Sequence, residues 1–413
     1  METSKQLTSA QHAALCERIE TLSIKEQQQS QIQPTGDTSS AIGFFKSTGL
    51  DLHEVLWAFA LILDSTRTAT KVTATVLSKV HNQDKKPSTI ILHVAQNCGI
   101  SENKQRCAAF RNYKEKLEGW ISMCEEPSSD AIMNCCRGRI SGYYRLAKKV
   151  FNGYEENNPF WDWKPTEEPL HTFARELKVL LGHINKSLND NATIKNYDKH
   201  GTLDKAWTFL EEHGKTFNEL WTGVRHGTEQ VPSCTSEFHG PQIRTRVCQY
   251  FKTIENLAKV PRAIQTFVGF WEYMASSGLR FEIWPIPSDG TAAIKSNNRK
   301  LPHCEMQLLQ YFEGEGRQYK AETWNVIGCS KRPCYCCAFV INHGSDFTFR
   351  ESHGKIYSPW PLPERYAHDS RLPAALRELD NALEKRISDL VKDTRKNHGH
   401  TDPDSPTSMD WPA

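Results

Sequence analysis

One histidine, one glutamate and two cysteines stand at spacings that suit metal chemistry. His303 is followed two residues later by Glu305, and Pro333 precedes the pair Cys334 and Cys337. One imidazole and two thiolates form a ligand set that zinc favours, and a catalytic zinc site leaves its fourth position open for water. The sequence therefore predicts that His303, Cys334 and Cys337 bind Zn²⁺.

The two cysteines are expected at the start of a helix. Pro333 suits the first helical position, and residues three apart, such as Cys334 and Cys337, lie on one face of a helix. The positive end of the helix dipole there favours thiolates over thiols. Cys336 would point to roughly the opposite side of the same helix. Both ligand sulfurs are therefore expected to face one ion.

The order His-x-Glu and then Pro-Cys-x-x-Cys is similar to the zinc-site signature of the cytidine-deaminase-like superfamily. In detail, residues 303–309 (HCEMQLL) and 328–337 (GCSKRPCYCC) resemble a poorly characterised branch of nucleic acid or nucleotide deaminase-like proteins that is expanded in fungi. The resemblance covers about residues 278–395. It implies a three-layer α/β/α fold for that part of the chain.

The resemblance also implies a reaction. It is the hydrolytic deamination of a cytosine- or adenine-type base, in which zinc-bound hydroxide is the nucleophile and Glu305 carries protons to the ring nitrogen and the departing amine. The expected substrate is a nucleoside, a nucleotide or a single-stranded nucleic acid.

A different class of protein is compatible with the same residues. A catalytically inactive, deaminase-like binding module would keep the zinc ion as a structural element. Structural zinc sites close with a fourth protein ligand, and Cys304, Cys329 or Cys336 could supply it, although free cysteines more often pack as small hydrophobic residues. The presence of Glu305 favours the catalytic alternative.

Two groups of polar residues are candidate substrate contacts. An Asn pair lies just before the His-x-Glu helix, where related enzymes often place an Asn that binds base or ribose, but such a pair also suits a simple turn. Basic residues near both motifs would hold phosphates or merely form a solvated rim. The candidates are Asn297, Asn298, Lys331 and Arg332, with Lys295, Arg299 and Lys300 nearby.

The chain around the motifs indicates an α/β domain over residues 276–395. Strands are expected at 279–284, 291–295 and 323–329, with a further strand pair at 346–358. Helices are expected at 302–312 and 333–342. A closing helix follows Pro373, because Leu376, Leu379, Leu383 and Ile387 recur at spacings of three and four.

The chain before residue 276 has mostly helical periodicity. Asp51 can cap a first helix, and the spacing of Val72, Val76, Leu77 and Val80 predicts a second helix that pairs with it. We therefore expect a mostly α-helical domain over residues 45–275. Its other expected helices lie at 106–123, 129–151, 170–188, 203–220 and 246–275.

Both ends are polar. We expect a disordered arm at 1–44, with a short helix near 13–22, and a disordered tail at 396–413. The 13 cysteines and the absence of an apolar leader predict an intracellular protein, cytoplasmic or nuclear, rather than a disulfide-bonded secreted one. No apolar run is long enough for a membrane span. The net charge of +2 predicts no global attraction to polyanions, so any such site must be local.

Overall fold

The computed structural model defines a mixed α/β protein. The described residues are 9–25, 49–64, 72–80, 88–97, 108–122, 127–154, 158–165, 168–190, 201–226, 238, 241–286, 302–314, 316, 319, 323–357, 360 and 371–398.

A four-stranded mixed sheet lies at the centre of the molecule, with the strand order β3-β2-β1-β4. Strands β1 (Thr73–Val80) and β2 (Thr89–Gln96) form an antiparallel hairpin. The edge strand β3 (Arg280–Pro285) runs parallel to β2, and the two-residue β4 (Gly328–Cys329) pairs antiparallel with β1. Residues from opposite ends of the chain therefore share one sheet.

The helix that we expected over residues 72–80 is wrong, because this segment is strand β1, and the sequence reading missed β2. Six of the eight β1 residues and all eight β2 residues are buried. A strand buried on both faces loses the alternation of apolar and polar residues that identifies a strand. The Val and Thr content, which suits extended backbone, was the remaining signal.

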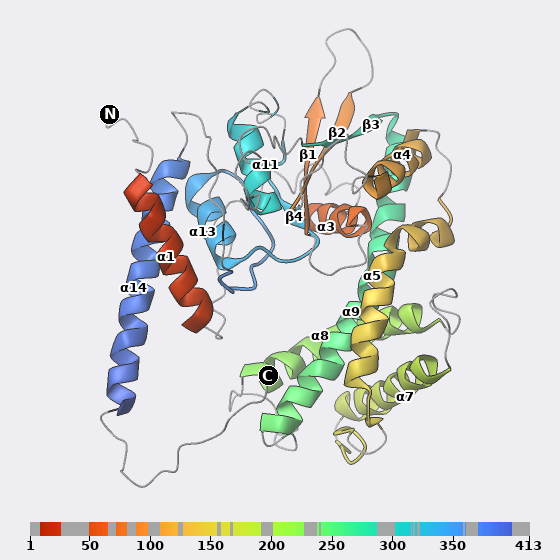
Figure 1. Cartoon of the computed structure of the whole chain (residues 1–413). Helices are drawn as coiled ribbons and strands as arrows, with labels where there is room; N and C mark the ends of the chain where they lie inside the picture. Colours follow the sequence, from red (N-terminus) through yellow and green to blue (C-terminus); the bar gives the residue numbers. More distant parts are fainter. Residues whose placement is uncertain are drawn as a thin grey trace.

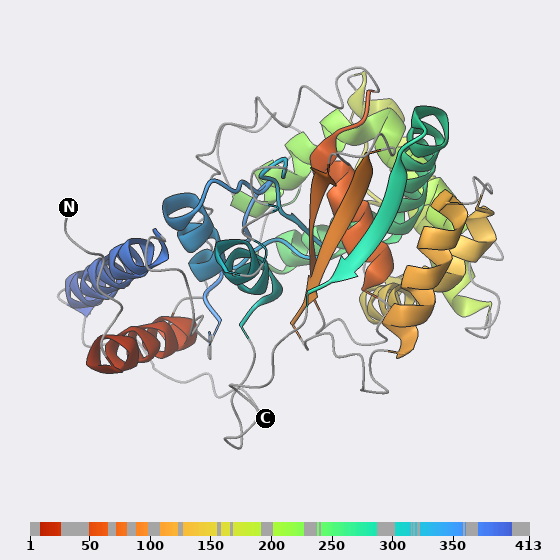
Figure 2. The ribbon, with the colours of Figure 1, turned by 90° about the horizontal axis from the view of Figure 1, so that it is seen from above.

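Helices cover both faces of the sheet (Figure 2). On one face, α3 (Leu52–Leu63) packs against β1 and β4, and Thr75 donates a hydrogen bond to the Leu56 carbonyl at 2.9 Å. On the other face, Ala74 and Val76 pack in one core with α11 (Cys304–Glu313) and α13 (Tyr335–Gly344). The expected three-layer α/β/α arrangement is present.

Two local features fix α3 against the sheet. Its N-terminus is capped by Asp51, whose side chain accepts a hydrogen bond from the His53 N–H at 2.8 Å, as the sequence predicts. Gly328 of β4 packs against its backbone, and an added Cβ there would lie 2.3 Å from Leu56 Cβ. Glycine is required at this close approach. It brings β4 onto α3 together with residues 330–337, which we call the zinc segment because they include the predicted ligands Cys334 and Cys337.

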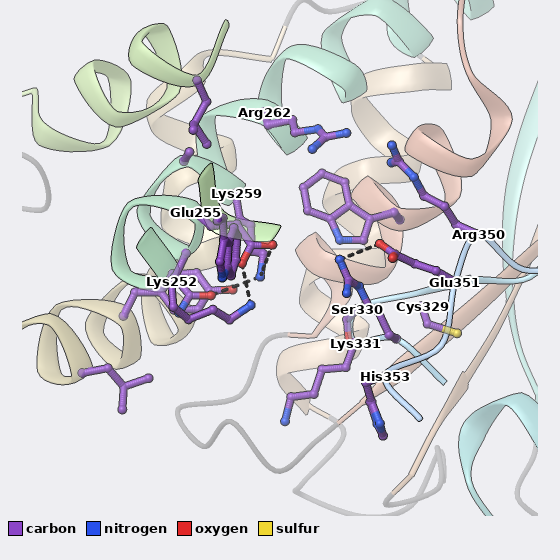
Figure 3. A pocket seen from close by; sticks show the side chains of 18 of the residues that line it. Lys252, Glu255, Lys259, Arg262, Cys329, Ser330, Lys331, Arg350, Glu351 and His353 are labelled. Carbon is purple, nitrogen blue, oxygen red and sulfur yellow. Dashed lines mark hydrogen bonds and ion pairs between the residues drawn. The ribbon is translucent and has the colours of Figure 1, made fainter. Parts of the chain in front are cut away.

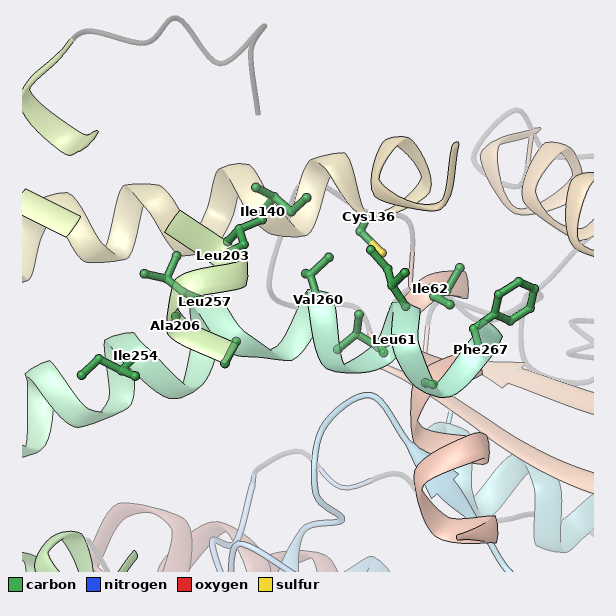
Figure 4. Packing of buried hydrophobic residues seen from close by; sticks show 14 of the residues in the cluster. Leu61, Ile62, Cys136, Ile140, Leu203, Ala206, Ile254, Leu257, Val260 and Phe267 are labelled. Carbon is green, nitrogen blue, oxygen red and sulfur yellow. The ribbon is translucent and has the colours of Figure 1, made fainter. Parts of the chain in front are cut away.

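Among the described residues, five helices follow β2 and precede β3, and we call these five the helical part. The expected helices are confirmed as α4 (Ala108–Ser122), α5 (Ser129–Val150), α7 (Leu170–Asn189), α8 (Thr202–His226) and α9 (Pro241–Ser277). Helix α9 packs on α3, α5 and α8, and Figure 4 shows its apolar side chains among those of the other three helices. The core of the helical part is thus continuous with one face of the sheet.

The boundary that we expected near residue 276 stays a prediction. The chain leaves the sheet after β2, builds the helical part and returns as β3, which pairs with β2. The sheet therefore contains strands from both sides of that boundary. In the sequence, the helical part lies between β2 and β3, which are neighbours in the sheet.

Two further helices lie side by side at one edge of the molecule (Figure 1). The short helix expected near 13–22 is confirmed as α1 (Ser9–Lys25), and the closing helix is confirmed as α14 (Leu372–His398). Arg18 of α1 pairs with Asp380 of α14. The segment expected as an arm therefore includes a helix with a tertiary contact.

The strands expected near the second motif are shorter than the sequence suggested. Of residues 323–329, only Gly328 and Cys329 form a ladder, with single bridges at Thr323 and Val326. The expected strand pair at 346–358 is wrong for its described residues, which contain one bridge residue, Thr348. The alternation of Phe347 and Phe349 reflects burial in the core around α13. The strand expected at 291–295 lies outside the described residues.

Candidate zinc site

The structure brings His303, Cys334 and Cys337 together. His303 is the N-cap residue of α11, and Cys334 is the N-cap residue of α13. His303 Nδ1 lies 3.5 Å from Cys334 Sγ and 3.3 Å from Cys337 Sγ. One ligand atom from each of the three residues lies within 4.8 Å of the others.

These separations suit a tetrahedral zinc site. With Zn–S bonds of about 2.3 Å and Zn–N bonds of about 2.0 Å, tetrahedral angles place a ligand sulfur and a ligand nitrogen about 3.5 Å apart. The two observed S···N distances lie close to that value. Both the chemistry and the spacing of the donor atoms therefore fit zinc, and zinc binding by these residues stays a prediction.

The start of α13 differs in detail from the sequence prediction. The helix begins at Tyr335, so Pro333 precedes the N-cap and does not occupy the first helical position. Cys334 has extended backbone, and its sulfur accepts a hydrogen bond from the Cys337 N–H at 3.4 Å. The capping geometry still turns both sulfurs toward His303.

Hydrogen bonding makes Cys334 suitable as a thiolate ligand. Burial alone would raise the pKa of this thiol, but hydrogen bonds from Cys337 and His303 outweigh burial and hold the pKa well below its ordinary value. Thiolate is the form that binds metal. A helix N-terminus stabilises negative charge in addition.

Glu305 lies in the first turn of α11, two residues after the histidine, and is 3% exposed. Burial raises the pKa of its carboxyl group, against the charge of His303, which lowers it. A buried carboxyl with a raised pKa can hold a proton closer to neutral pH than an exposed one. The side chain is therefore suited to exchange protons beside the metal ligands.

The other cysteines near the site, Cys304, Cys329 and Cys336, contact Glu305 or pack in the core. The Cys304 thiol donates to Glu305 Oε2 at 3.5 Å, and the Cys329 thiol also hydrogen-bonds to Glu305. Burial raises the pKa of both thiols, and that of Cys336, well above the ordinary value. Among the described residues, none of these three belongs to the group of ligand atoms around His303.

A tryptophan supports one of the ligand sulfurs. Trp360 is buried, and its indole Nε1–H donates to Cys337 Sγ at 3.2 Å. Trp360 lies in the core around α13. No local pattern identifies this contact, because the two residues are 23 positions apart.

The candidate substrate contacts are only partly described. Lys331 is half-buried, and Arg332 is exposed and pairs with Glu351 at 2.5 Å. Both residues line a cleft beside the zinc site. Asn297 and Asn298 lie outside the described residues, as do Lys295, Arg299 and Lys300.

A second group of possible metal ligands lies in the helical part. Glu176, Glu212 and His213 place one ligand atom each within 4.8 Å. His213 Nε2 lies 2.6 Å from Glu176 Oε2, an interaction that joins α7 and α8. Glu176 comes from α7, whereas Glu212 and His213 are adjacent on α8, so no single sequence motif contains all three.

Two further findings bear on the class of protein. Among the described residues, no helix combines the length and the apolar composition of a membrane span. The nine cysteines whose side chains are described are free thiols.

Comparison with known families agrees with the geometry. Residues 302–364 match the family described as OTT_1508-like deaminase, and this segment contains His303, Glu305, Cys334, Cys337 and Trp360. No curated protein and no solved structure gives a significant match. Residues 302–364 are therefore similar to a deaminase family of the cytidine-deaminase-like kind.

Proposed function

We propose that this protein is a zinc-dependent hydrolytic deaminase of a cytosine- or adenine-type base. The observation that carries the proposal is the convergence of His303, Cys334 and Cys337 with the buried carboxyl of Glu305 in the matched segment. Three protein ligands with an acid–base residue beside them form the arrangement that zinc deaminases use.

Each residue has a separate role in this proposal. His303, Cys334 and Cys337 would hold the ion. A bound zinc ion supplies a Lewis acid that lowers the pKa of a water molecule to about 7. Glu305 would accept a proton at its carboxylate and donate it to the substrate base, which its raised pKa favours. The thiols of Cys304 and Cys329 would keep that carboxylate oriented.

The alternative is a catalytically inactive binding module with a structural zinc ion. Such a site is normally closed by a fourth protein ligand. Two of the three cysteines available for that role hydrogen-bond to Glu305, and none groups with the ligand atoms among the described residues. This arrangement supports catalysis over the structural alternative.

The substrate and the compartment are also part of the proposal. Lys331 and Arg332 are proposed to contact a phosphate of a nucleotide or a single-stranded nucleic acid, since both line the cleft next to Cys334. Asn297 and Asn298 are proposed to contact the base or ribose. The free cysteines support an intracellular location, cytoplasmic or nuclear.

Glu305→Gln tests the function. The variant keeps the size of the side chain and leaves the three zinc ligands in place, so zinc content and folding should equal those of the wild type. Ammonia release should fall by about 10²- to 10⁴-fold. The panel comprises cytidine, adenosine, their monophosphates and single-stranded DNA and RNA, and the exposed Glu384→Gln is the matched control.

The two proteins should differ on at least one substrate. If the zinc-loaded wild type releases no ammonia from any member of the panel, or if Glu305→Gln is as active as Glu384→Gln, the binding module becomes the better account.

A further inference from the structure

A cleft of about 2040 Å³ lies between the helical part and the zinc site. Helices α5, α8 and α9 form one wall, and residues 327–333 and 349–357 form the other. Figure 3 shows Lys252, Glu255 and Lys259 facing Ser330 and Lys331 across it. Sites for small molecules are usually about 300–1,000 Å³. The cleft therefore has room for a ligand larger than one nucleotide.

The lining of the cleft is strongly basic. Eleven Lys and Arg side chains line it, against the two carboxylates of Glu255 and Glu351. The whole chain has a net charge of only +2, so positive charge is concentrated here. A cleft lined by charge of one sign attracts ligands of the opposite sign.

Existing ion pairs neutralise only part of this charge. Six of the eleven cations share four carboxylates, those of Glu54, Asp64, Glu255 and Glu351. The other five have no ion pair with any residue that the structure describes. These five are Arg145, Lys149, Arg244, Lys331 and Lys355.

The cations of the two walls also crowd one another. Burial lowers the pKa of Lys252, and the nearby charges of Lys259 and Arg332 lower it further. Burial alone would raise the pKa of Glu255, but Lys259, Lys252 and Arg332 outweigh it and lower that pKa. Arg332 belongs to the wall of the zinc site and the other three to α9. An anion bound between the walls would relieve this repulsion.

Aromatic rings accompany the cations. Trp57, Trp207 and Trp221 line the cleft and are only partly buried. The Arg262 guanidinium lies 5.3 Å from the ring centroid of Trp57 and 5.8 Å from that of Trp207. Lys252 Nζ lies 5.5 Å from the ring centroid of Trp221. Alternating cations and aromatic faces are typical of surfaces that bind unpaired bases and their phosphates.

The lining of the cleft includes the residues that precede the proposed ligand Cys334. Cys329 lines the cleft, and its thiol hydrogen-bonds to Glu305. The lining residues Ser330, Lys331, Arg332 and Pro333 follow it and lead into the proposed ligand Cys334. A strand that lies in the cleft would thus pass beside Cys329, which contacts Glu305, and beside the residues that lead into Cys334.

We propose that the helical part and the zinc segment together bind single-stranded nucleic acid in this cleft, with phosphates on the basic residues and bases on the tryptophans. That the bound strand serves as a substrate rests on the proposed deaminase function. The proposal assigns the helical part the role of holding this polymer. DNA and RNA both carry the phosphates and bases that the cleft would contact, so each polymer is tested separately.

The binding test uses exposed residues that carry no ion pair with the described residues, so that folding is preserved. The cleft variant is Arg145→Gln/Lys149→Gln/Arg244→Gln. The matched control is Lys164→Gln/Lys215→Gln/Lys385→Gln, which removes the same charge from exposed positions outside the cleft lining. Fluorescence anisotropy measures binding of labelled 15-nucleotide single strands at several salt concentrations.

A single strand releases about 0.7 counterions for each phosphate contact that it makes with a protein. The plot of log K against log salt has a negative slope, and the cleft variant should reduce its magnitude by about 2. The same variant should weaken binding by about 10- to 100-fold at 0.1 M salt. The control should match the wild type. Trp221→Leu should weaken binding by roughly 5- to 150-fold without changing the salt slope, because it removes stacking and no charge.

Several results would overturn the proposal. They are equal losses in the cleft and control variants, a mononucleotide that competes as well as the 15-nucleotide strand, and a duplex that binds as tightly through the same residues. Cleft-dependent binding of either DNA or RNA supports it. Since binding is read without turnover, failure of deamination alone would count against the proposed function and leave this inference standing.

Discussion

Arg139 of α5 pairs with the buried carboxylate of Asp64 at the end of α3. The same carboxylate accepts a hydrogen bond from Ser330 Oγ at 2.9 Å, and Ser330 Oγ accepts one from the Thr73 N–H at 3.0 Å. Ser330 is four residues before the proposed ligand Cys334. This network joins the helical part, the sheet and the zinc segment.

Arg139→Met tests the energetic importance of that network. The substitution removes the cation that balances the buried Asp64 carboxylate, so the free energy of unfolding should fall by about 3–5 kcal/mol. Adding Asp64→Asn removes the uncompensated charge and should restore a large part of the loss. Urea unfolding of the two variants and the wild type gives the comparison, and a single variant within about 0.5 kcal/mol of the wild type would contradict this role.

Trp360→Phe tests the support of the proposed metal ligand Cys337. The substitution removes the indole N–H that donates to the Cys337 sulfur. Loss of such a contact behind a ligand typically weakens metal binding by about 10- to 100-fold. Competition with a chromophoric chelator measures the zinc affinity. Trp163→Phe makes the same change in the core of the helical part and should leave the zinc affinity unchanged. Equal losses of zinc affinity in the two variants would contradict a specific role of Trp360.

His93 is predicted to make the fold sensitive to acid. It lies on β2 among the rings of Trp284, Tyr311, Phe312 and Tyr319, and burial lowers its pKa to about 3. The unfolded chain binds a proton there below about pH 6.5, whereas the folded chain does so only near pH 3. The stability contributed by the neutral ring is therefore complete above pH 6.5 and is lost as the pH falls from 6.5 toward 3.

The expected loss from this residue is about 2 kcal/mol between pH 7 and pH 5. His93→Gln cannot be protonated in this range. The Gln side chain retains a polar partner for Ser78, whose hydroxyl lies 2.9 Å from His93 Nε2 in the wild type. Unfolding measured at both pH values should therefore show a smaller acid loss in the variant. Parallel pH curves for the two proteins would show that His93 is not responsible.

The sequence predicted the features that depend on local spacing. The proposed zinc ligands lie in two short motifs, so their types and order were visible without any knowledge of tertiary structure. Helices with one buried face, such as α7 and α14, were found because their apolar residues repeat at helical spacing. Strands β1 and β2 were not found, because burial on both faces removes the alternation.

The sequence alone could not predict features that depend on contacts between distant segments. Arg139 and Asp64 are 75 positions apart, and nothing near either residue indicates a partner. The basic cleft draws cations from α5, α9 and the zinc segment, so the near-neutral total charge concealed it. The position of α5 opposite Lys331 and Arg332 is visible only in the fold.

The zinc content of the purified protein tests the central claim most directly. The wild type should contain about one zinc ion per chain by elemental analysis, because three ligands of the right kind converge in it. Cys334→Ala/Cys337→Ala should reduce this to near zero, whereas Cys135→Ala/Cys136→Ala, a pair of buried cysteines in the helical part, should retain it. A wild-type protein without zinc after gentle purification, or a double variant of Cys334 and Cys337 that keeps its zinc, would contradict the account.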